Sequence, residues 1–177
     1  MHTRVALLRG INVGGKHLIK MADLSALMQQ HDCQQVRTYI QSGNLVFHHT
    51  NAQQTELAAQ LSALISQRFG FAVPVYLLTG QCFLEIVASN PFAQASLDGK
   101  SVHVYFLEHA ARAANHTKLM QLKHPSEQYH LTDKAFYLFA PQGVGRSKLA
   151  AKVDKCLGVN TTARNANTLC KLRDMLS

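Results

Sequence analysis

The sequence opens on the stretch Val5-Ala6-Leu7-Leu8-Arg9-Gly10-Ile11-Asn12-Val13-Gly14-Gly15-Lys16, in which an apolar run passes directly into a glycine-rich loop. The run from Thr3 to Leu8 is apolar on both of its alternating faces, which is typical of a central strand covered on each side. The loop carries three glycines and two cations in the eight residues from Arg9 to Lys16. Since glycine allows backbone N–H groups to converge and the cations add charge, the loop predicts a site for an anion.

The residues after this loop alternate between helical and extended patterns. Apolar residues recur at helical spacing from Met21 to Met28, and Gln41-Ser42-Gly43-Asn44 is a turn-forming tetrad between two short strands. The expected elements are strands at 3–8, 35–40, 45–48 and 73–78, and helices from 20 onward and at 52–69. The order strand, helix, strand, strand, helix, strand is that of a ferredoxin-like unit, which it completes in about eighty residues.

A similar order of elements recurs in the second half. A short helical segment at 81–88 and a linker at 91–99 precede strands at 102–107, 128–131 and 135–139, helices at 110–122 and 147–157, an extended piece at 159–163 and a final helix. The sequence therefore predicts an α+β protein of two ferredoxin-like (α/β plait, βαββαβ) subdomains packed together. The first covers residues 1–80, a helical linker covers 81–100, and the second covers 101–177 with an extra C-terminal helix.

Composition favours a folded protein with a polyanionic partner. The chain has 177 residues, 47% of them hydrophobic, and its 18 Lys and Arg against 10 Asp and Glu give a formal charge of +8. This balance is typical of proteins that bind nucleic acid or nucleotides, although a solvated cationic surface has the same composition. The chain shows no secretory signal, no apolar run of membrane-spanning length and no C-x-x-C pair among its cysteines. We therefore expect a cytoplasmic protein with reduced thiols and no membrane partner.

The glycine loop nearly matches a nucleotide P-loop. Gly10 to Lys16 fits the spacing G-x-x-x-x-G-K, but His17 stands where Ser or Thr would bind magnesium. The following helix is also expected to begin several residues after Lys16, whereas a P-loop helix begins at the lysine. A true P-loop is therefore disfavoured. The loop is either an anion site without magnesium or a turn that needs glycine only to reverse the chain.

A second glycine turn, Gly143-Val144-Gly145-Arg146-Ser147-Lys148, opens the helix expected at 147–157. Free N–H groups at the start of a helix, with two cations beside them, have the composition of an anion site. Lys148, Lys152 and Lys155 then fall on one face of that helix and form a basic stripe. For the stripe alone, a solvated helix face is the better explanation.

The segment 161–168 comes before the last helix and is dense in residues that prefer caps and turns. Capping explains one or two of them. It does not explain Arg164 together with Asn165 and Asn167, which have the donors to bind a phosphate or a base edge.

Other signatures of binding or catalysis are weak. Tyr105 with Phe136, or Tyr137 with Phe139, would stack on RNA bases if displayed on the second sheet, but core aromatic residues give the same pattern. The 10 histidines show no metal-ligand frame, and neither a G-x-S-x-G motif nor a cysteine with a histidine signature marks a nucleophile. We therefore expect no metal site and assign no catalytic residue.

Three motifs occur in an order that resembles the family catalogued as domain of unknown function 1697, DUF1697. They are Arg9 to Lys16, Arg37 to Asn44, and Thr162-Ala163-Arg164-Asn165 with Thr168, Lys171 and Leu172. The resemblance spans nearly the whole chain. It implies a cytoplasmic, mostly bacterial protein of two ferredoxin-like subdomains, with no established activity, cofactor or catalytic residue.

The chain departs from the resemblance at one position. The family usually has a tryptophan after Arg-Asn, where this chain has Ala166. If that aromatic side chain stacks on a ligand in the family, binding here would be weaker or different. If it is a packing anchor, a neighbouring side chain fills the space.

The motifs coincide with the loops selected on physical grounds, and together they predict a protein that binds a phosphate-bearing ligand, either a nucleotide or a single-stranded nucleic acid, without a cofactor. Cations would neutralise phosphate, glycine N–H groups would orient it, and amides would supply hydrogen bonds. The expected ligand-binding residues are Arg9, Asn12, Gly14, Gly15, Lys16, Gln41, Ser42, Asn44, Arg146, Lys148, Arg164 and Asn165. Two alternatives stay open: an enzyme acting on a small phosphorylated or nucleotide substrate, and a protein-interaction module that uses the basic helix 147–157. The pattern does not predict an oligomeric state.

Overall fold

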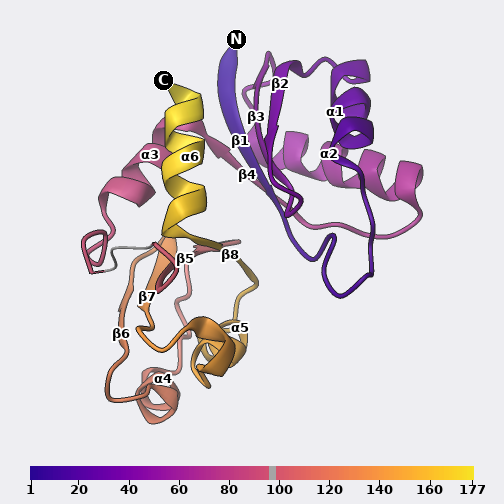
Figure 1. Ribbon diagram of the computed structural model, residues 1–177. Helices are drawn as coiled ribbons and strands as arrows, with labels where there is room; N and C mark the ends of the chain where they lie inside the picture. The colour runs from indigo at the N-terminus through magenta and orange to yellow at the C-terminus, as the bar shows by residue number, and fades with distance from the viewer. Residues whose placement is uncertain (96–98) are drawn as a thin grey trace. The chain divides into compact units, whose positions relative to one another are not determined.

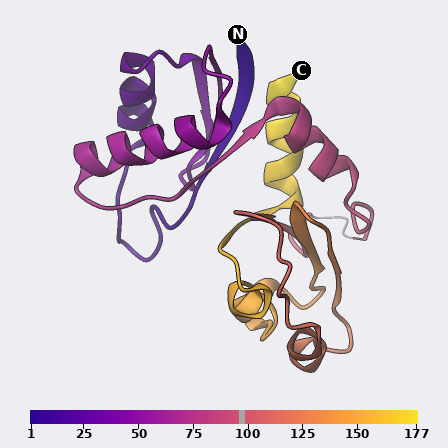
Figure 2. The same ribbon diagram turned by 180° about the vertical axis from the view of Figure 1, so that it is seen from behind.

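The computed structural model describes residues 1–95 and 99–177, which contain two four-stranded antiparallel sheets and six α-helices. These residues form two compact units, the first made of Met1–Glu85 with Lys171–Ser177 and the second of Ile86–Cys170 (Figure 1 and Figure 2). Residues 96–98, within the expected linker at 81–100, lie outside the described residues. Among the helices of the described ranges, none is both long and apolar enough to cross a membrane.

The first unit contains a sheet in the strand order β2-β3-β1-β4, with every neighbouring pair antiparallel. Along the chain its elements are β1 (His2–Leu8), α1 (Met21–Gln30), β2 (Gln34–Tyr39), β3 (Asn44–His49), α2 (Gln54–Phe69) and β4 (Val75–Thr79). Strand β1 lies inside the sheet and is buried from Arg4 to Leu8. The predicted order of elements in this half and its buried central strand are therefore confirmed.

The core of the first unit lies between the sheet and two helices. Ala6 and Phe47 of the strands pack in one cluster with Leu24 of α1 and Leu61 of α2, all of them almost fully buried. Both ribbon views show α1 and α2 on the same face of the sheet (Figure 1 and Figure 2). Burial of a large apolar side chain contributes about 1.5–3 kcal/mol, so this cluster fixes the strand that leads into the glycine loop.

Helix α2 begins at Gln54 and not at residue 52, where the periodicity placed its start. The guanidinium group of Arg4 donates to the carbonyl oxygens of Asn51, at 2.8 Å, and of Ala52, at 3.1 Å. The side chain of Asn51 also accepts the backbone N–H of Gln53 at 2.8 Å. Because these contacts already satisfy the backbone groups before the helix, residues 51 and 52 stay outside it.

The second unit contains a sheet in the strand order β6-β7-β5-β8, again antiparallel throughout. The remaining elements of the chain are α3 (Gly80–Ala88), β5 (Val102–Leu107), α4 (His116–Leu122), β6 (Gln128–Leu131), β7 (Ala135–Phe139), α5 (Val153–Leu157), β8 (Thr161–Asn165) and α6 (Ala166–Leu176). The core of this unit gathers Tyr105 and Phe136 of the sheet with Leu119 of α4 and Leu157 of α5.

Two helices of the second half are shorter than predicted. The region 110–122 is helical only from His116, because the Asn115 side chain accepts the backbone N–H of Lys118 at 2.9 Å and caps the helix at that point. The region 147–157 contains a 3-10 turn at Ala150–Lys152 before α5, and the Ser147 hydroxyl accepts the N–H of Ala150 at 2.9 Å. The prediction of one continuous basic helix is therefore wrong.

The extended piece expected at 159–163 is present as strand β8, which lies two residues later and pairs with β5 from Thr161 to Asn165. The aromatic residues of the second sheet lie in the core, since Tyr105, Phe136 and Tyr137 are 8%, 0% and 1% exposed. The Tyr137 hydroxyl donates to the carbonyl oxygen of Ile86 at 2.8 Å. The core interpretation of these aromatic residues is confirmed, and they form no base-stacking platform.

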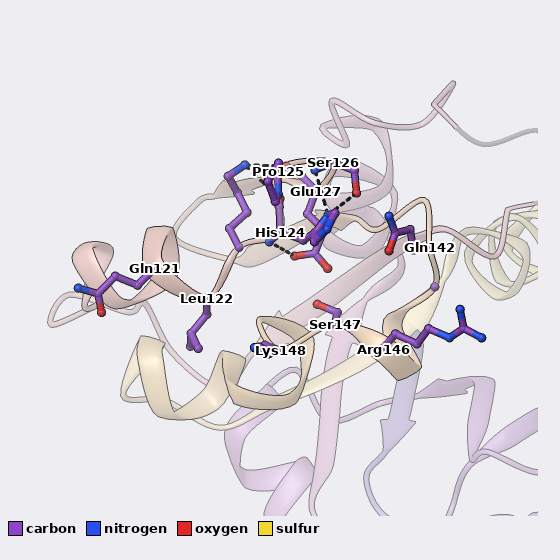
Figure 3. A pocket seen from close by; sticks show the side chains of 12 residues that line it. Gln121, Leu122, His124, Pro125, Ser126, Glu127, Gln142, Arg146, Ser147 and Lys148 are labelled. Carbon is purple, nitrogen blue, oxygen red and sulfur yellow. Dashed lines mark hydrogen bonds between the residues drawn. The ribbon is translucent and has the colours of Figure 1, made fainter.

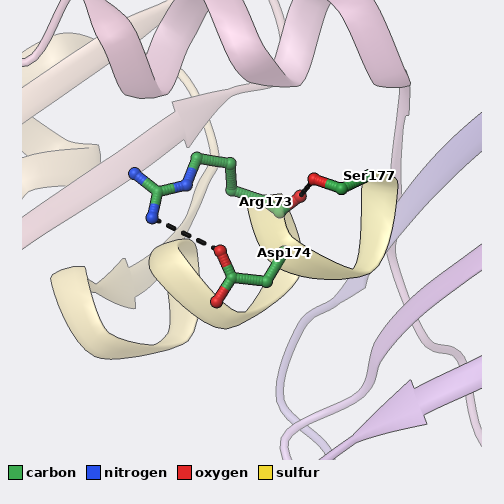
Figure 4. A network of polar contacts seen from close by, with 3 residues as sticks. All are labelled: Arg173, Asp174 and Ser177. Atoms are coloured by element: carbon green, nitrogen blue, oxygen red, sulfur yellow. Dashed lines mark hydrogen bonds and ion pairs between the residues drawn. The ribbon is translucent and has the colours of Figure 1, made fainter.

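The end of α6 belongs to the first unit. There the Arg37 guanidinium group of β2 donates to the carbonyl oxygen of Met175, which places a cation at the negative end of the helix. The same turn carries a surface ion pair between Arg173 and Asp174 at 3.3 Å, beside a contact of the Ser177 hydroxyl with the Arg173 carbonyl oxygen (Figure 4).

Candidate functional site

The glycine loop forms a short hairpin that ends in a tight turn. The backbone N–H of Asn12 donates to the His17 carbonyl oxygen, and the N–H of Lys16 donates to that of Val13, each at 3.1 Å. Gly14 and Gly15 have φ angles of 58° and 72°, the two left-handed residues of a type I′ turn. Helix α1 begins only at residue 21, so the loop lacks the helix on which a P-loop binds phosphate.

One asparagine joins the first motif loop, residues 9–19, to the second motif loop, residues 39–44. The Nδ2 atom of Asn12 donates to the carbonyl oxygens of Ile19, at 2.9 Å, and Gln41, at 2.7 Å, while its Oδ1 atom accepts the N–H of Ile19 at 2.9 Å. The predicted residues Asn12 and Gln41 therefore lie together. Both N–H groups of the Asn12 amide donate to groups within the protein. Any hydrogen bond from this side chain to a ligand would therefore have to be accepted by its Oδ1 atom.

The second motif loop is held closed by Gly43 and Asn44. A Cβ atom at Gly43 would lie 2.6 Å from Leu8 Cβ and 2.9 Å from Ile11 Cδ1, and its φ of 76° is itself unfavourable for other residues. Asn44 is fully buried and donates through Nδ2 to the carbonyl oxygen of Tyr39, at 3.0 Å, and to Ser42 Oγ, at 2.9 Å. Ser42 and Asn44 thus hold the turn together, and their contact with a ligand stays a prediction.

The surface of the paired motif loops is both cationic and aliphatic. Lys16 is exposed and Arg9 is half-buried, while Val13 and Leu18 are each 67% exposed and Ile40 is 50% exposed. Ile40 also has a φ of 48°, a left-handed conformation that a β-branched residue rarely adopts. These aliphatic side chains were absent from the predicted site, because a single apolar residue in a loop adds no periodic signal.

The third motif lies on β8 and at the start of α6. Arg164 is 8% exposed, and its Nη1 atom donates to Thr162 Oγ1, at 2.9 Å, and to the carbonyl oxygen of Ala163, at 2.8 Å. Burial lowers the pKa of Arg164 to about 10. Asn165 accepts the N–H of Thr168 at 2.9 Å and so caps α6. Both side chains therefore have structural partners, and a ligand role for either of them stays a prediction.

A cavity of about 250 Å³ lies in the second unit between the turns at 121–127 and 142–148. Its lining includes both predicted cations of this region, Arg146 and Lys148, together with Lys123 and His124 of the other turn. In Figure 3 the Ser147 hydroxyl points across toward 124–127, whereas the Arg146 guanidinium group extends outward. Arg146 and Lys148 are exposed, and their side chains contact no polar partner within the described part of the chain.

Hydrogen bonds fix the wall of this cavity at 123–127. The N–H of His124 donates to Glu127 Oε2 and the N–H of Glu127 donates to the His124 carbonyl oxygen, each at 2.9 Å. Lys123 Nζ donates to the carbonyl oxygen of Glu127 at 2.9 Å. Glu127 is 4% exposed, so the lining combines a buried carboxylate with four basic side chains nearer the surface.

This wall was not part of the predicted site. Pro125 indicated only the end of a helix, and two turns that meet across a cavity have no characteristic spacing along the chain. Within the ranges that the structure describes, no three His, Cys, Asp or Glu side chains are grouped so as to hold a metal ion.

Comparison with solved structures finds the conserved bacterial protein SP0830 from Streptococcus pneumoniae, with a TM-score of 0.75, 22% sequence identity and 99% of each chain covered. At this identity the likeness extends to the fold alone. None of the curated proteins matches the chain. The family described as "Protein of unknown function (DUF1697)" matches residues 1–137, which include the first two motifs. With more than half of its 177 residues matched, the chain belongs to the DUF1697 family.

Proposed function

We propose that this protein binds a phosphate-bearing ligand, either a nucleotide or a single-stranded nucleic acid, at the cavity of the second unit. The observation that carries the proposal is that basic residues of two turns line one cavity, with Arg146 and Lys148 on one turn and Lys123 and His124 on the other. Phosphate oxygens accept charge-assisted hydrogen bonds from such groups, which are about twice as strong as neutral ones.

The size of the cavity limits how much of the ligand it encloses. Pockets that enclose a drug-sized molecule usually measure about 300–1,000 Å³, and this cavity measures about 250 Å³. It is therefore too small to enclose a whole nucleotide, and most of the ligand stays outside. Because Arg146 and Lys148 are exposed at its edge, a strand of successive phosphates has cations to follow there.

The buried carboxylate of Glu127 determines where the phosphate lies in this proposal. A phosphate placed against Glu127 would meet like charge in a poorly solvated place, which is unfavourable. A phosphate beside Arg146 and Lys148 avoids that contact. We therefore place it at the exposed edge of the cavity, with Ser147 between the two cations in sequence.

The proposal is tested by anisotropy titration of a labelled single-stranded RNA, together with thermal-shift measurements on nucleotides. The double variant Arg146→Gln/Lys148→Gln removes two cations from the cavity. The matched control, Lys152→Gln/Lys155→Gln, removes two exposed cations just beyond it. We expect the cavity variant to bind at least about tenfold more weakly and to lose about 1.4 from the slope of log K against log salt, at about 0.7 per phosphate contact.

The control should retain most of the affinity. Equal losses in both variants would show that net charge alone drives binding, and the cavity would then have no specific role. A wild-type chain that neither binds RNA nor gains thermal stability with any nucleotide would refute the proposal.

We also infer that the predicted subdomains 1–80 and 101–177 are ferredoxin-like plaits, with Lys171–Ser177 at the end of the second range packing into the first unit. The order of strands and helices along the chain and the two sheet orders β2-β3-β1-β4 and β6-β7-β5-β8 support this inference. We still expect the protein to be located in the cytoplasm.

A further inference from the structure

We infer that the paired motif loops of the first unit dock onto the surface of a membrane that contains anionic phospholipid. The inference rests on exposed aliphatic side chains placed among cations on a loop that projects from its unit. Figure 1 and Figure 2 both show the indigo segment after β1 extending beyond the sheet and the helices of the first unit. This surface is separate from the cavity of the proposed function, so either proposal can fail without the other.

The aliphatic part of the surface comes from three side chains. Val13, Leu18 and Ile40 are 67%, 67% and 50% exposed, and they make up three of the five large hydrophobic residues that are exposed in the described chain. Hydrogen bonds bring their neighbours together, since Asn12 bonds both His17 and Gln41. The three residues therefore belong to the two loops that Asn12 joins.

The charge along the two loops themselves has one sign. No acidic residue occurs in 1–22 or in 33–55, the two stretches that contain the motif loops. Lys16 lies between Val13 and Leu18, Lys20 follows and is exposed, and Arg9 begins the loop. Basic side chains are attracted to an anionic leaflet, and aliphatic groups that enter the acyl boundary add to this attraction.

Contacts within the first unit support the conformation of the first motif loop. His17 stacks on Phe71 with ring centroids 4.5 Å apart, and its Nδ1 atom lies 3.1 Å from the carbonyl oxygen of Gly10. The amide of Asn12 ties the loop to Gln41. Val13 and Leu18 are therefore kept exposed by contacts at the base of the loop, and little conformational entropy is lost on docking.

A membrane fits this surface better than the other polyanionic partners do. Single-stranded nucleic acid is usually held by aromatic side chains that stack on its bases, whereas the large hydrophobic residues exposed here are aliphatic and the His17 ring is already stacked on Phe71. Protein interfaces depend mainly on Trp, Tyr and Arg, and Leu and Val are under-represented among their hot spots. The inference departs from the expectation of no membrane partner, which rested on the lack of an apolar span.

The chain contains no tryptophan, which allows a clean fluorescence test. The substitution Leu18→Trp places a single indole on the first motif loop, and Met120→Trp places one on α4 at a residue that is 58% exposed. We expect the Leu18→Trp emission to shift to shorter wavelength with phosphatidylcholine vesicles that contain phosphatidylglycerol. We expect no shift with pure phosphatidylcholine, and none from Met120→Trp with either vesicle.

Sedimentation with the same vesicles measures the contribution of the native side chains. We expect Val13→Ser/Leu18→Ser to lower the partition coefficient by at least about tenfold, because the variant loses the aliphatic groups that enter the acyl boundary. Lys16→Gln should lower it severalfold, while Met120→Ser and Lys118→Gln, matched exposed changes on α4, should leave it unchanged. Circular dichroism and the melting temperature identify any variant that is misfolded.

Three results would overturn the inference. The first is a wild-type chain that does not sediment with anionic vesicles. The second is a Val13→Ser/Leu18→Ser variant that sediments as well as the wild type, because net charge alone would then account for the binding. The third is a loss of RNA affinity in that variant equal to its loss of vesicle affinity, which would make the loops a nucleic-acid surface.

Discussion

The amide nitrogen of Asn12 lies 2.7 Å from the carbonyl oxygen of Gln41, so one hydrogen bond joins residues 29 positions apart. The same side chain makes two further bonds to the backbone of Ile19. Asn12 has a φ of 54°, and asparagine is among the few residues that accept this left-handed conformation readily. One residue therefore sets both the backbone of the first motif loop and its junction with the second.

Replacement of Asn12 should destabilise the first unit. Asn12→Ala removes all three side-chain hydrogen bonds and leaves Ile19 and Gln41 with unpaired backbone groups, so we expect the free energy of unfolding to fall by about 1–3 kcal/mol. Asn12→Gly should cost less, because glycine keeps the left-handed backbone without strain. Urea unfolding followed by circular dichroism measures both. Gln60→Ala, on the exposed face of α2, is the control and should change stability by less than about 0.5 kcal/mol.

Addition of a methyl group at Gly43 should be more costly than at Gly14. Both glycines have positive φ, but a Cβ at Gly43 would lie 2.6 Å from Leu8 Cβ, whereas one at Gly14 has nothing within 4 Å. We expect Gly43→Ala to cost about 2–4 kcal/mol from backbone strain and overpacking together, and Gly14→Ala about 1–2 kcal/mol from strain alone. Denaturant midpoints compare the two. A Gly43→Ala variant as stable as Gly14→Ala would contradict the packing of Gly43 against β1.

Ile40 should be replaceable with a gain in stability. Its φ of 48° costs about 1–2 kcal/mol in a residue other than glycine or asparagine, and half of its surface is exposed, so little burial is lost when it is replaced. We expect Ile40→Asn to raise the free energy of unfolding by about 0.5–1 kcal/mol. Leu18→Asn, which removes an exposed aliphatic side chain without a left-handed backbone, should leave it nearly unchanged. A destabilised Ile40→Asn variant would show that the side chain makes a contribution larger than its strain.

His103 should make the protein less stable in mild acid. Its Nδ1 atom is buried without a hydrogen-bond partner in the described part of the chain, and burial lowers the pKa of His103 below its ordinary value of 6.5. The unfolded chain then binds more protons than the folded one as the pH falls through 6.5, so stability is present above that pH and is lost below it. We expect His103→Leu to weaken this decline, measured as urea stability between pH 7.5 and about 5. If the stability of His103→Leu fell with pH as steeply as that of the wild type, the role of His103 in the decline would be contradicted.

The ion pair between Arg173 and Asp174 should contribute almost nothing to the free energy of unfolding. Its side chains are 52% and 60% exposed, and exposed pairs of this kind are usually worth about 0–1 kcal/mol (Figure 4). We expect Asp174→Asn to shift the urea midpoint by no more than experimental error. A clear loss of stability would mean that Asp174 has another role at the end of α6.

The elements of the first half were predictable because their signals are local. The apolar run of β1 is buried as its two-sided pattern predicts, and the tetrad from Gln41 to Asn44 forms the expected turn. The start of α2 was missed because Arg4 of a distant strand satisfies the carbonyl groups before it. A side-chain contact across 47 residues leaves no trace in the hydrophobic periodicity.

The second half was harder to predict because pairing between distant segments decides its structure. The segment Thr161-Thr162-Ala163-Arg164-Asn165 has too few apolar residues to alternate, yet it forms β8 along β5. For the candidate site, the sequence pointed to Arg146 and Lys148 through their glycine turn. It did not point to Lys123 and His124, which come beside them only when the chain folds.

The bond between Arg37 and the carbonyl oxygen of Met175 affects the order in which the two units can be completed during translation. The second unit is one continuous segment, Ile86–Cys170, whereas the first needs Lys171–Ser177, which are translated after the whole of the second unit. The first unit, most of which is translated before the second, is therefore completed after it. A nascent chain stalled before residue 171 would carry a complete second unit. Its first unit would lack the contact between β2 and the end of α6.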